Sequence, residues 1–198
     1  MIAIMDYGVG NLGSVLNAFK YLGYDAKITS DVNEIINADK VILPGVGAFD
    51  HAMKRFIEKG FDKVMDILLE KNTPVLGICV GMQMLFEYSY EYGKHKGLGI
   101  LKGNIIKFDE KLDKVPQIGW NEIKVLKENR LLDGVDGKYV YFVHSYHVDS
   151  TEYAISETTY ANVTYPSAIH YKNIYATQFH PEKSGEVGLK ILKNFGEL

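Results

Sequence analysis

Short apolar runs alternate with amphipathic runs over the first half of the chain. Four runs are predicted strands: Ile2–Met5, Ala26–Thr29, Lys40–Leu43 and residues 74–78. Three are predicted helices: residues 12–22, residues 51–71 with a break near Gly60, and residues 82–90. The runs "VILPG" and "PVLGIC" are apolar without alternation, as central parallel strands are. This alternation indicates an α/β fold, a mostly parallel central sheet with helices on both faces.

The pattern changes in the second half. Residues 99–177 are rich in Tyr, Val, Ile and Thr, and turn residues interrupt them at "GN", "DG" and "KN". This pattern predicts hairpins and antiparallel strands. A helix is expected over residues 184–195, with Ser184 at its N-cap and Glu186 in its first turn. The length of 198 residues, without a linker, predicts a single domain over residues 1–198.

Composition narrows the class of protein. Hydrophobic residues make up 46% and charged residues 24% of the chain, with a net charge of −3 and no long basic run. We therefore expect a globular protein that binds neither nucleic acid nor an anionic membrane. The longest apolar stretch, residues 74–86, is too short to span a bilayer, and "MIAIMDYG" lacks the basic start of a secretory signal. With one cysteine, no intrachain disulfide forms, so a reducing, cytoplasmic compartment is expected.

The stretch "DYGVGNLGS" carries a glycine fingerprint. Gly8, Gly10 and Gly13 spell G-x-G-x-x-G between a predicted strand and a predicted helix, and Asp31 follows at about the spacing of a ribose-binding acid. One interpretation is a dinucleotide site. The other is a loop at the carboxyl edge of the sheet that binds no nucleotide. The fingerprint alone does not decide between them.

The only cysteine lies in a distinctive turn. "PVLGICVGMQML" places Cys79 in G-x-C-x-G, between Gly77 and Gly81, after a predicted strand and before a predicted helix. A lone cysteine is commonly a small buried hydrophobe. This context instead resembles a nucleophile elbow, in which a tight turn presents the nucleophile and a helix N-terminus stabilises the thiolate. The N–H of Val80 is expected to face a developing oxyanion.

A base for this thiol is found in "ATQFHPEKS". Pro181 disfavours helical geometry for His180, so the segment is expected to be extended, with His180 and Glu182 on one face. Glu182 then orients the imidazole of His180 toward Cys79, which completes a nucleophile, base and orienter. His51, His95 and His170 are expected to be surface or satisfied core residues. His144 and His147 are predicted to point to opposite faces of an extended segment, so no metal site is expected.

With these motifs the sequence resembles the class I glutamine amidotransferases over essentially the whole chain. "GICVGMQ" resembles the nucleophile motif of that family, and "HPE" resembles the end of its triad. The resemblance implies a flavodoxin-like architecture and hydrolysis of the side-chain amide of glutamine, without a cofactor. It assigns Cys79 as the nucleophile, His180 as the acid and base, and Glu182 as its orienter. One matching elbow and triad outweigh the glycine fingerprint, so we favour the loop that binds no dinucleotide.

The resemblance also implies a glutamine pocket. Gln83 matches the residue that holds the amino-acid end of the substrate. "PGVG" matches the oxyanion strand, and "HSY" matches a segment whose backbone lines the pocket. The pocket residues implied in these two segments are Gly45, Val46, Gly47, Ser145 and Tyr146. Because glycines flank Val46, a peptide flip there is inexpensive, and we expect a partner to select the active orientation.

Within the family, three segments resemble glutaminase subunits that supply ammonia to a (β/α)8-barrel cyclase in histidine biosynthesis. They are "DYGVGNLGS", "PQIGWN" and "HPEKSG". No second domain or phosphate-binding cluster remains to use ammonia, so a heterodimer is expected. Its interface is expected to include Asn11, Trp120, Asn121, Tyr141 and Lys183. Core packing of Trp120 and Tyr141 and a solvated Lys183 are the simpler alternatives.

Three other functions remain open. The nearest is a glutaminase subunit that serves vitamin B6 or purine synthesis. The next is a stand-alone cysteine hydrolase or peptidase, which turns over without a partner. The last is a catalytically silent interaction protein, in which replacing Cys79 changes nothing.

Overall fold

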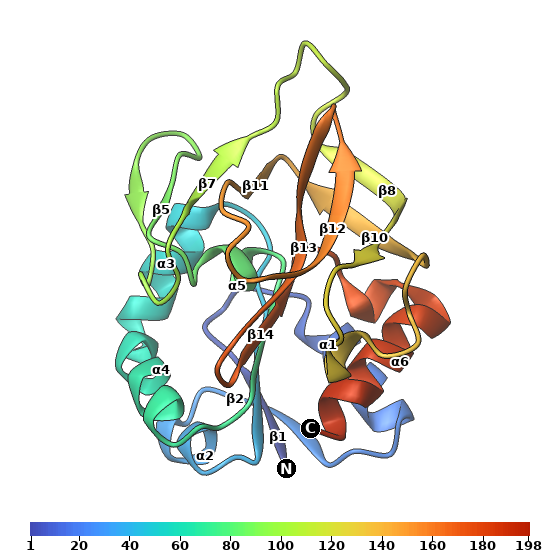
Figure 1. Cartoon of the computed structure of the whole chain (residues 1–198). Helices are drawn as coiled ribbons and strands as arrows, with labels where there is room; N and C mark the ends of the chain where they lie inside the picture. The colour runs from blue at the N-terminus through green and yellow to red at the C-terminus, as the bar shows by residue number, and fades with distance from the viewer.

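An eight-stranded mixed sheet runs through the middle of the molecule (Figure 1). The structure is a computed structural model that describes residues 1–198. The strand order is β2-β1-β3-β4-β14-β13-β12-β9, and the first five strands are parallel while the last three add antiparallel pairs. These strands are β1 (Ile2–Met5), β2 (Ala26–Thr29), β3 (Lys40–Leu43), β4 (Val75–Ile78), β9 (Lys124–Val125), β12 (Ala154–Tyr160), β13 (Val163–Tyr171) and β14 (Ile174–Thr177).

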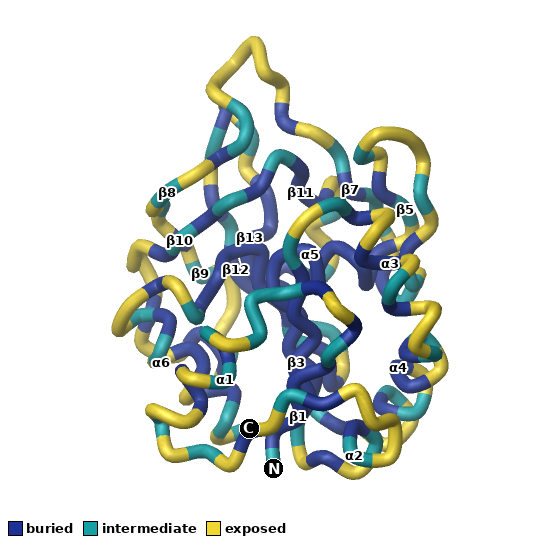
Figure 2. Tube along the Cα trace, turned by 180° about the vertical axis from the view of Figure 1, so that it is seen from behind, coloured by how far each residue is buried: buried dark blue, intermediate teal, exposed yellow.

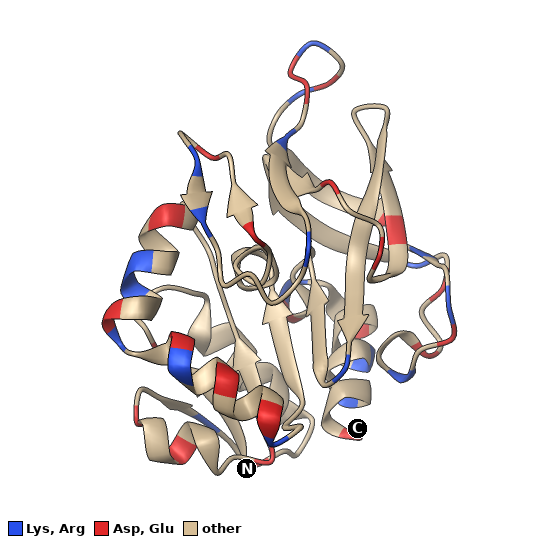
Figure 3. Ribbon diagram, turned by 60° about the vertical axis from the view of Figure 1, so that its left-hand side comes forward, with Lys and Arg blue, Asp and Glu red and all other residues tan.

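Helices cover both faces of the parallel strands. In Figure 1, α1 and α6 lie on one side, and α2, α3 and α4 lie on the other. Their bounds are α1 (Leu12–Tyr21), α2 (Val32–Ile36), α3 (Phe49–Glu58), α4 (Phe61–Glu70) and α6 (Gly185–Gly196). The strands between them are buried (Figure 2), and Lys, Arg, Asp and Glu gather on outer helix faces and loops (Figure 3). The predicted α/β class is therefore confirmed.

Two smaller sheets stand above the carboxyl edge of the parallel strands. β8 (Gln117–Glu122) pairs antiparallel with β10 (Tyr139–His144). A four-stranded sheet has the order β11-β7-β5-β6. Its strands are β5 (Tyr88–Ser89), β6 (His95–Lys96), β7 (Asn104–Lys107) and β11 (Tyr146–Val148). The predicted hairpins in the second half are confirmed, and β13 and β14 meet at a turn where Lys172 has a φ of 53°.

One predicted helix is mostly wrong. Residues 82–90 were expected to be helical, but α5 (Val80–Gln83) ends after one turn and β5 follows. The carbonyl groups of Met84, Leu85 and Phe86 accept hydrogen bonds from residues 98–101 instead of from the next helical turn. Because the side chains of all three are fully buried, the apolar pattern fits a helix and a packed loop equally well.

One short helix was not predicted, and the last helix begins where it was expected. The short helix α2 was not predicted, although Asp31 caps it by accepting hydrogen bonds from the N–H groups of Asn33 and Glu34. Ser184 does occupy the N-cap position of α6, and Glu186 lies in the first turn. The Ser184 side chain makes no capping bond, because its hydroxyl donates to the carbonyl oxygen of His180.

The parallel strands place four loops side by side. The chain leaves β1 at Asp6, β3 at Pro44, β4 at Cys79 and β14 at Gln178. Since neighbouring parallel strands end at the same edge of a sheet, the predicted nucleophile, oxyanion strand and base all follow the same edge. No helix is long and apolar enough to cross a membrane.

Candidate active site

Cys79 lies on a strained turn between β4 and α5. Its φ and ψ are 54° and −110°, a conformation that is rare for a residue with a side chain. The flanking glycines are required by packing. A Cβ on Gly81 would lie 2.0 Å from the carbonyl oxygen of Leu43, and one on Gly77 would lie 3.0 Å from the carbonyl oxygen of Gly81. The predicted elbow geometry is therefore present.

The oxyanion strand after β3 packs directly against this elbow. A Cβ on Gly45 would lie 2.5 Å from the backbone nitrogen of Gly81, so this position has room only for glycine. Gly47 has a φ of 83°. The N–H groups of Gly47 and Val80 have no partner within the protein, and both residues line the same cavity. Two backbone donors are therefore left unpaired in residues that line the cavity.

Tyr7 makes a hydrogen bond to the first residue of the oxyanion strand, Pro44. Its buried hydroxyl donates to the carbonyl oxygen of Pro44 and lies 3.7 Å from the sulfur of Met84. Burial, reinforced by negative charge at Cys79, raises the pKa of Tyr7. The phenol therefore stays protonated and able to donate.

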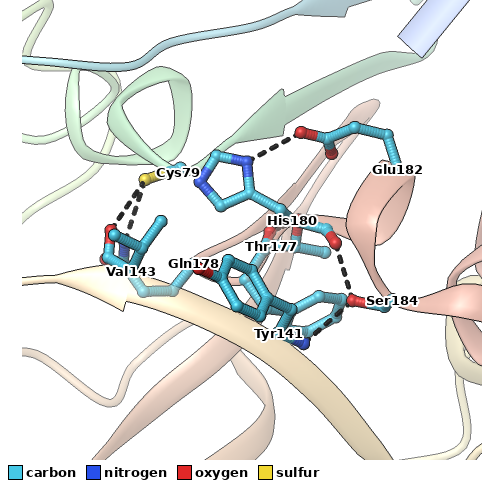
Figure 4. A network of polar contacts seen from close by, with 9 residues as sticks. Cys79, Tyr141, Val143, Thr177, Gln178, His180, Glu182 and Ser184 are labelled. Carbon is cyan, nitrogen blue, oxygen red and sulfur yellow. Dashed lines mark hydrogen bonds and ion pairs between the residues drawn. The ribbon is translucent and has the colours of Figure 1, made fainter. Parts of the chain in front are cut away.

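His180 lies between Glu182 and Cys79 (Figure 4). Its Nδ1 is 2.8 Å from the Oε1 of Glu182, and both side chains are 1% exposed. The Nε2 of His180 faces the sulfur of Cys79 and has no hydrogen-bond partner. Such contacts commonly tighten only when substrate binds. The three predicted triad residues thus come together.

The charge state of His180 is set by its two neighbours. Burial disfavours the imidazolium, but Cys79 and Glu182 favour it more strongly and raise the pKa of His180 from 6.5 to about 10. The ring is therefore held as an imidazolium between the sulfur of Cys79 and the carboxyl group of Glu182. One expectation about this segment is wrong. Pro181 to Lys183 form the 3-10 helix η2 (Pro181–Lys183) rather than an extended strand, so a tight turn makes the contact to Glu182.

A cavity of about 450 Å³ opens over the sulfur atom. It is lined by Gly10, Asn11, Val46, Gly47, Cys79, Val80, Gln83, Glu91, Val143, His144, Ser145, Tyr146, His180 and Lys183. The lining includes most of the predicted oxyanion and pocket residues. Gly45 and Glu182 do not line the cavity, but Gly45 packs on Gly81 and Glu182 contacts His180. A larger hollow of about 830 Å³ lies beside η1 (Arg130–Leu132) and α6, but no cysteine or histidine lines it. The chemistry therefore points to the smaller cavity.

Gln83 forms part of a chain of buried amides in the cavity wall. Its Nε2 donates to the carbonyl oxygen of Tyr146 and to the Oε1 of Gln178, both at 3.1 Å. The Nε2 of Gln178 in turn lies 3.7 Å from the sulfur of Cys79. The sulfur also lies 4.0 Å from the carbonyl oxygen of Val143. Gln178 was not singled out from the sequence, although it stands two residues before His180.

Glu91 is a second site residue that the sequence analysis missed. Its carboxylate reaches the cavity and accepts a hydrogen bond of 2.6 Å from the backbone N–H of Phe49. Burial raises the pKa of this half-buried carboxyl group. No local motif marks Glu91, because only tertiary packing brings the loop between β5 and β6 to the cavity.

The histidine pair behaves differently from the prediction. His144 and His147 were expected on opposite faces, but both rings pack on Phe108, with centroids 5.3 Å and 4.6 Å from it. Ser145 separates β10 from β11, and this break in the strand removes the alternation. Burial lowers the pKa of His144 to about 3. Anywhere in residues 1–198, no three His, Cys, Asp or Glu side chains gather closely enough to hold a metal ion.

The glycine fingerprint does not build a dinucleotide site. Asp31 uses its carboxylate to cap α2, so it is not left to hold a ribose. A Cβ on Gly13 would meet nothing within 4 Å, whereas the third glycine of a dinucleotide fold allows close packing of helix on strand. Gly10 and Asn11 instead line the cavity over Cys79. The favoured interpretation, a loop at the carboxyl edge, agrees with this geometry.

The predicted interface residues fall into two groups. Trp120 is 56% exposed and meets the ring of Tyr141 edge to face at 6.3 Å, while the Nζ of Lys183 lies 5.8 Å from the centre of that ring. Asn121 lies on the opposite side of β8 and donates to the carbonyl oxygen of Thr159. Trp120, Tyr141 and Lys183 thus form one exposed cluster beside the cavity, and Asn121 is not part of it.

Comparison with known proteins identifies the family of this chain. A family model described as Glutamine amidotransferase class-I matches residues 3–197. The chain belongs to the class I glutamine amidotransferase family. Solved structures of this fold include PurLQS from Thermotoga maritima, with a TM-score of 0.75 at 14% identity, covering 99% of this chain and 97% of that one.

Two full-length relatives of this glutamine amidotransferase carry a more specific name. A protein of Caldanaerobacter subterraneus subsp. tengcongensis is 52% identical, covering 100% of this chain and 98% of that protein. A protein of Methanocaldococcus jannaschii is 47% identical, covering 100% of both chains. Each is named imidazole glycerol phosphate synthase subunit HisH.

Proposed function

We propose that this glutamine amidotransferase is the glutaminase subunit of an imidazole glycerol phosphate synthase in histidine biosynthesis. The observation that carries the proposal is the strained Cys79 turn, which faces a paired His180 and Glu182 at the cavity. The relatives named HisH support the choice of pathway. The enzyme works in the cytoplasm, where the thiol of Cys79 stays reduced.

In this proposal Cys79 and His180 divide the chemistry of acylation. In the resting enzyme the Nε2 of His180 already holds the proton given up by the Cys79 thiol, and the sulfur attacks the side-chain amide carbon of glutamine. The carbonyl oxygen becomes an oxyanion, which the unpaired N–H groups of Val80 and Gly47 stabilise. His180 then gives its proton to the leaving nitrogen, so that ammonia departs and a glutamyl thioester remains.

Deacylation uses the same residues with a water molecule. His180 takes a proton from water, the hydroxide adds to the thioester carbon, and the carbon–sulfur bond breaks. The proton returns to the sulfur, and glutamate leaves. Glu182 keeps the imidazole oriented throughout, because its carboxylate holds Nδ1 at 2.8 Å.

The cavity wall supplies groups for the amino-acid end of glutamine. Both N–H groups of the Gln83 amide are already used, so its Oε1 is free to accept a hydrogen bond from the substrate ammonium. The carboxylate of Glu91 lies on the same wall and complements that positive charge. The backbone at Ser145 and Tyr146 closes the other side of the pocket.

The ammonia passes to a (β/α)8-barrel cyclase subunit in a heterodimer. The cyclase makes imidazole glycerol phosphate and an aminoimidazole carboxamide ribotide. We propose that the exposed cluster of Trp120, Tyr141 and Lys183 contacts it, together with Asn11 at the cavity rim. Ammonia is protonated and lost in bulk water, so an interface over the cavity mouth keeps it available for synthesis.

Regulation is proposed to act through the oxyanion strand. Packing against the elbow holds Gly45 in place. The peptide between Val46 and Gly47 can flip at little cost, because Gly47 has no side chain to strain at its φ of 83°. Binding of the cyclase selects the orientation in which the N–H faces the cavity. The isolated chain is then nearly inactive.

The test is glutamate release from glutamine, measured for the purified chain alone and with a cyclase subunit plus its nucleotide substrate. Activity that appears only in the complex, and is lost in Cys79→Ala, supports the proposal. Full activity of the chain alone, or no effect of the cyclase, contradicts the pathway and the gating while leaving the hydrolysis intact. Activity retained in Cys79→Ala contradicts the hydrolysis as well.

A further inference from the structure

Gln178 is the side-chain hydrogen-bond donor that lies on the sulfur of Cys79. It follows β14 directly, is 1% exposed, and its backbone N–H donates to the carbonyl oxygen of Ser167 at 2.8 Å. The Nε2 of Gln178 lies 3.7 Å from the sulfur. His180 has no hydrogen bond to the sulfur in this state. Figure 4 draws Gln178 and His180 approaching the sulfur from different sides.

The direction of the Gln178 amide follows from its neighbours. The carbonyl oxygen of Tyr146 can only accept, so the group that faces it must be the Nε2 of Gln83. The second hydrogen on this nitrogen then points at Gln178, which must turn its Oε1 toward Gln83. The Nε2 of Gln178 is left facing the sulfur. A backbone carbonyl thus sets both amides, and a flip of either one loses hydrogen bonds.

We propose that Gln178 is a catalytic donor to the thiolate, and that Gln83 locks it in the donating direction. The proposal rests on Cys79 being the nucleophile of the proposed function. An N–H that donates to the charged form of a group favours that form. With the thiol proton on the Nε2 of His180, the negative sulfur accepts the Gln178 hydrogen bond. Thiolate is then present at lower pH, with the sulfur aimed at the cavity.

The same chain of amides joins the substrate pocket to the nucleophile. The Oε1 of Gln83 faces the cavity, while its Nε2 holds Gln178. A ligand that donates a hydrogen bond to the Oε1 of Gln83 therefore polarises that amide. The polarised amide donates more strongly from its Nε2 to the Oε1 of Gln178. Occupation of the pocket and the charge of the sulfur become coupled through two side chains, without movement of the backbone.

The test measures the rate of alkylation of Cys79 by iodoacetamide across pH, on the purified chain. Because Cys79 is the only cysteine, the label reports on one atom. We compare Gln178→Met, which keeps the length and loses the donor, with Gln178→Glu, which accepts from Gln83 but turns an oxygen toward the sulfur. The matched control is Gln117→Met, since Gln117 is also buried but its amide contacts Tyr165 rather than the sulfur.

The expected result is a displacement of the pH midpoint of alkylation. One hydrogen bond to a charged group corresponds to about a ten-fold change in thiolate population, so Gln178→Met raises the midpoint by about one pH unit. Gln178→Glu raises it further, and Gln117→Met overlays the native profile. In the complex, kcat for glutamine falls about ten-fold in Gln178→Met.

A residue that only packs gives a different outcome. The pH midpoint of alkylation then stays at its native value in Gln178→Met and Gln178→Glu, even if the maximal alkylation rate changes. This result overturns the proposal. Should Gln178→Met fail to fold by circular dichroism, Gln178→Glu decides alone. Alkylation needs neither glutamine nor a cyclase, so failure of the proposed pathway leaves this test unaffected.

Discussion

The two turns that bring the triad together differ in how far side chains add to their backbone contacts. The Cys79 turn is held by backbone against backbone, with Gly81 and Gly45 packed too closely for any Cβ. The His180 turn also has backbone contacts, because a Cβ on Gly188 would lie 1.8 Å from the carbonyl oxygen of Pro181 and the N–H of Lys183 donates to the carbonyl oxygen of His180. Side chains reinforce this turn, since Glu182 binds the imidazole and the hydroxyl of Ser184 donates to the carbonyl oxygen of His180 and accepts from the N–H of Tyr141.

This difference determines which substitutions each turn can tolerate. A backbone contact cannot be weakened by degrees, because one added methyl group displaces the strand behind it. A side-chain hydrogen bond that reinforces a turn can be removed while the backbone contacts keep the path of the chain. We therefore expect substitution of a glycine at the Cys79 turn to act on folding, and substitution of Glu182 at the His180 turn to act on chemistry.

The largest effect is expected for Gly81→Ala. Its Cβ would lie 2.0 Å from the carbonyl oxygen of Leu43, so β3 must shift away from the elbow. We expect a loss of about 4 kcal/mol or more in the free energy of unfolding, measured by chemical denaturation. Gly13→Ala is the matched control, since nothing lies within 4 Å of that Cβ on α1, and it should be neutral or stabilise by up to about 1 kcal/mol. Equal effects at both glycines would remove the contrast.

Glu182→Gln should keep the fold and lose the chemistry. The amide can still reach the Nδ1 of His180, but it no longer favours the imidazolium or enforces the tautomer. We expect kcat of the complex to fall by about 10²-fold with little change in KM. Glu186→Gln, an exposed change in the first turn of α6, should retain native kcat. A native kcat in Glu182→Gln would show that the turn does not orient the base.

The raised pKa of His180 predicts a specific pH dependence of stability. The native ring keeps its proton up to about pH 10, whereas the unfolded ring releases it near 6.5. The stabilisation is therefore complete below about pH 6.5 and is lost as pH rises toward 10. The free energy of unfolding should fall by up to about 1.4 kcal/mol per pH unit in this window. Denaturation of the native chain and Glu182→Gln checks this, and parallel slopes for both would contradict it.

The smallest effect is expected for Ser184→Ala. The buried hydroxyl makes bonds of 2.6 Å to the carbonyl oxygen of His180 and 2.9 Å to the N–H of Tyr141. Its loss removes the acceptor of the Tyr141 N–H and leaves the carbonyl oxygen of His180 with the N–H of Lys183 alone, at a cost of about 1–2 kcal/mol in stability. Because the imidazole keeps its contact with Glu182, kcat should change by less than about three-fold. A fall as large as that in Glu182→Gln would mean that Ser184 carries the orientation.

The contrast also explains what could be predicted from the sequence. The strands Ile2–Met5, Ala26–Thr29 and Lys40–Leu43 were predicted to the residue, because short apolar runs with polar borders have one compatible structure here. Residues 82–90 were predicted wrongly, because Met84, Leu85 and Phe86 are all fully buried. An apolar run without an exposed face does not distinguish a helix from a packed loop. Cys79, His180 and Glu182 were found because each lies in a compact local motif.

Residues that reach the site from elsewhere could not be found in this way. Glu91 belongs to the cavity because of its hydrogen bond to Phe49, a partner 42 positions away. Gln178 lies next to the triad motif, but its role depends on Gln83 and Tyr146, which are distant in sequence. Asn121 stays a predicted interface residue, and its side chain lies on the other face of β8 from Trp120.

The central claim is that Cys79 acts as a nucleophile on glutamine within this cavity. The most direct measurement is mass spectrometry of the chain after its complex with the cyclase subunit is exposed to 6-diazo-5-oxo-L-norleucine, a glutamine analogue with an electrophilic carbon in place of the amide. The account predicts one adduct, located on Cys79, whose formation is slowed by added glutamine and abolishes glutamate release. An adduct on another residue, or full glutaminase activity in the labelled protein, would contradict it.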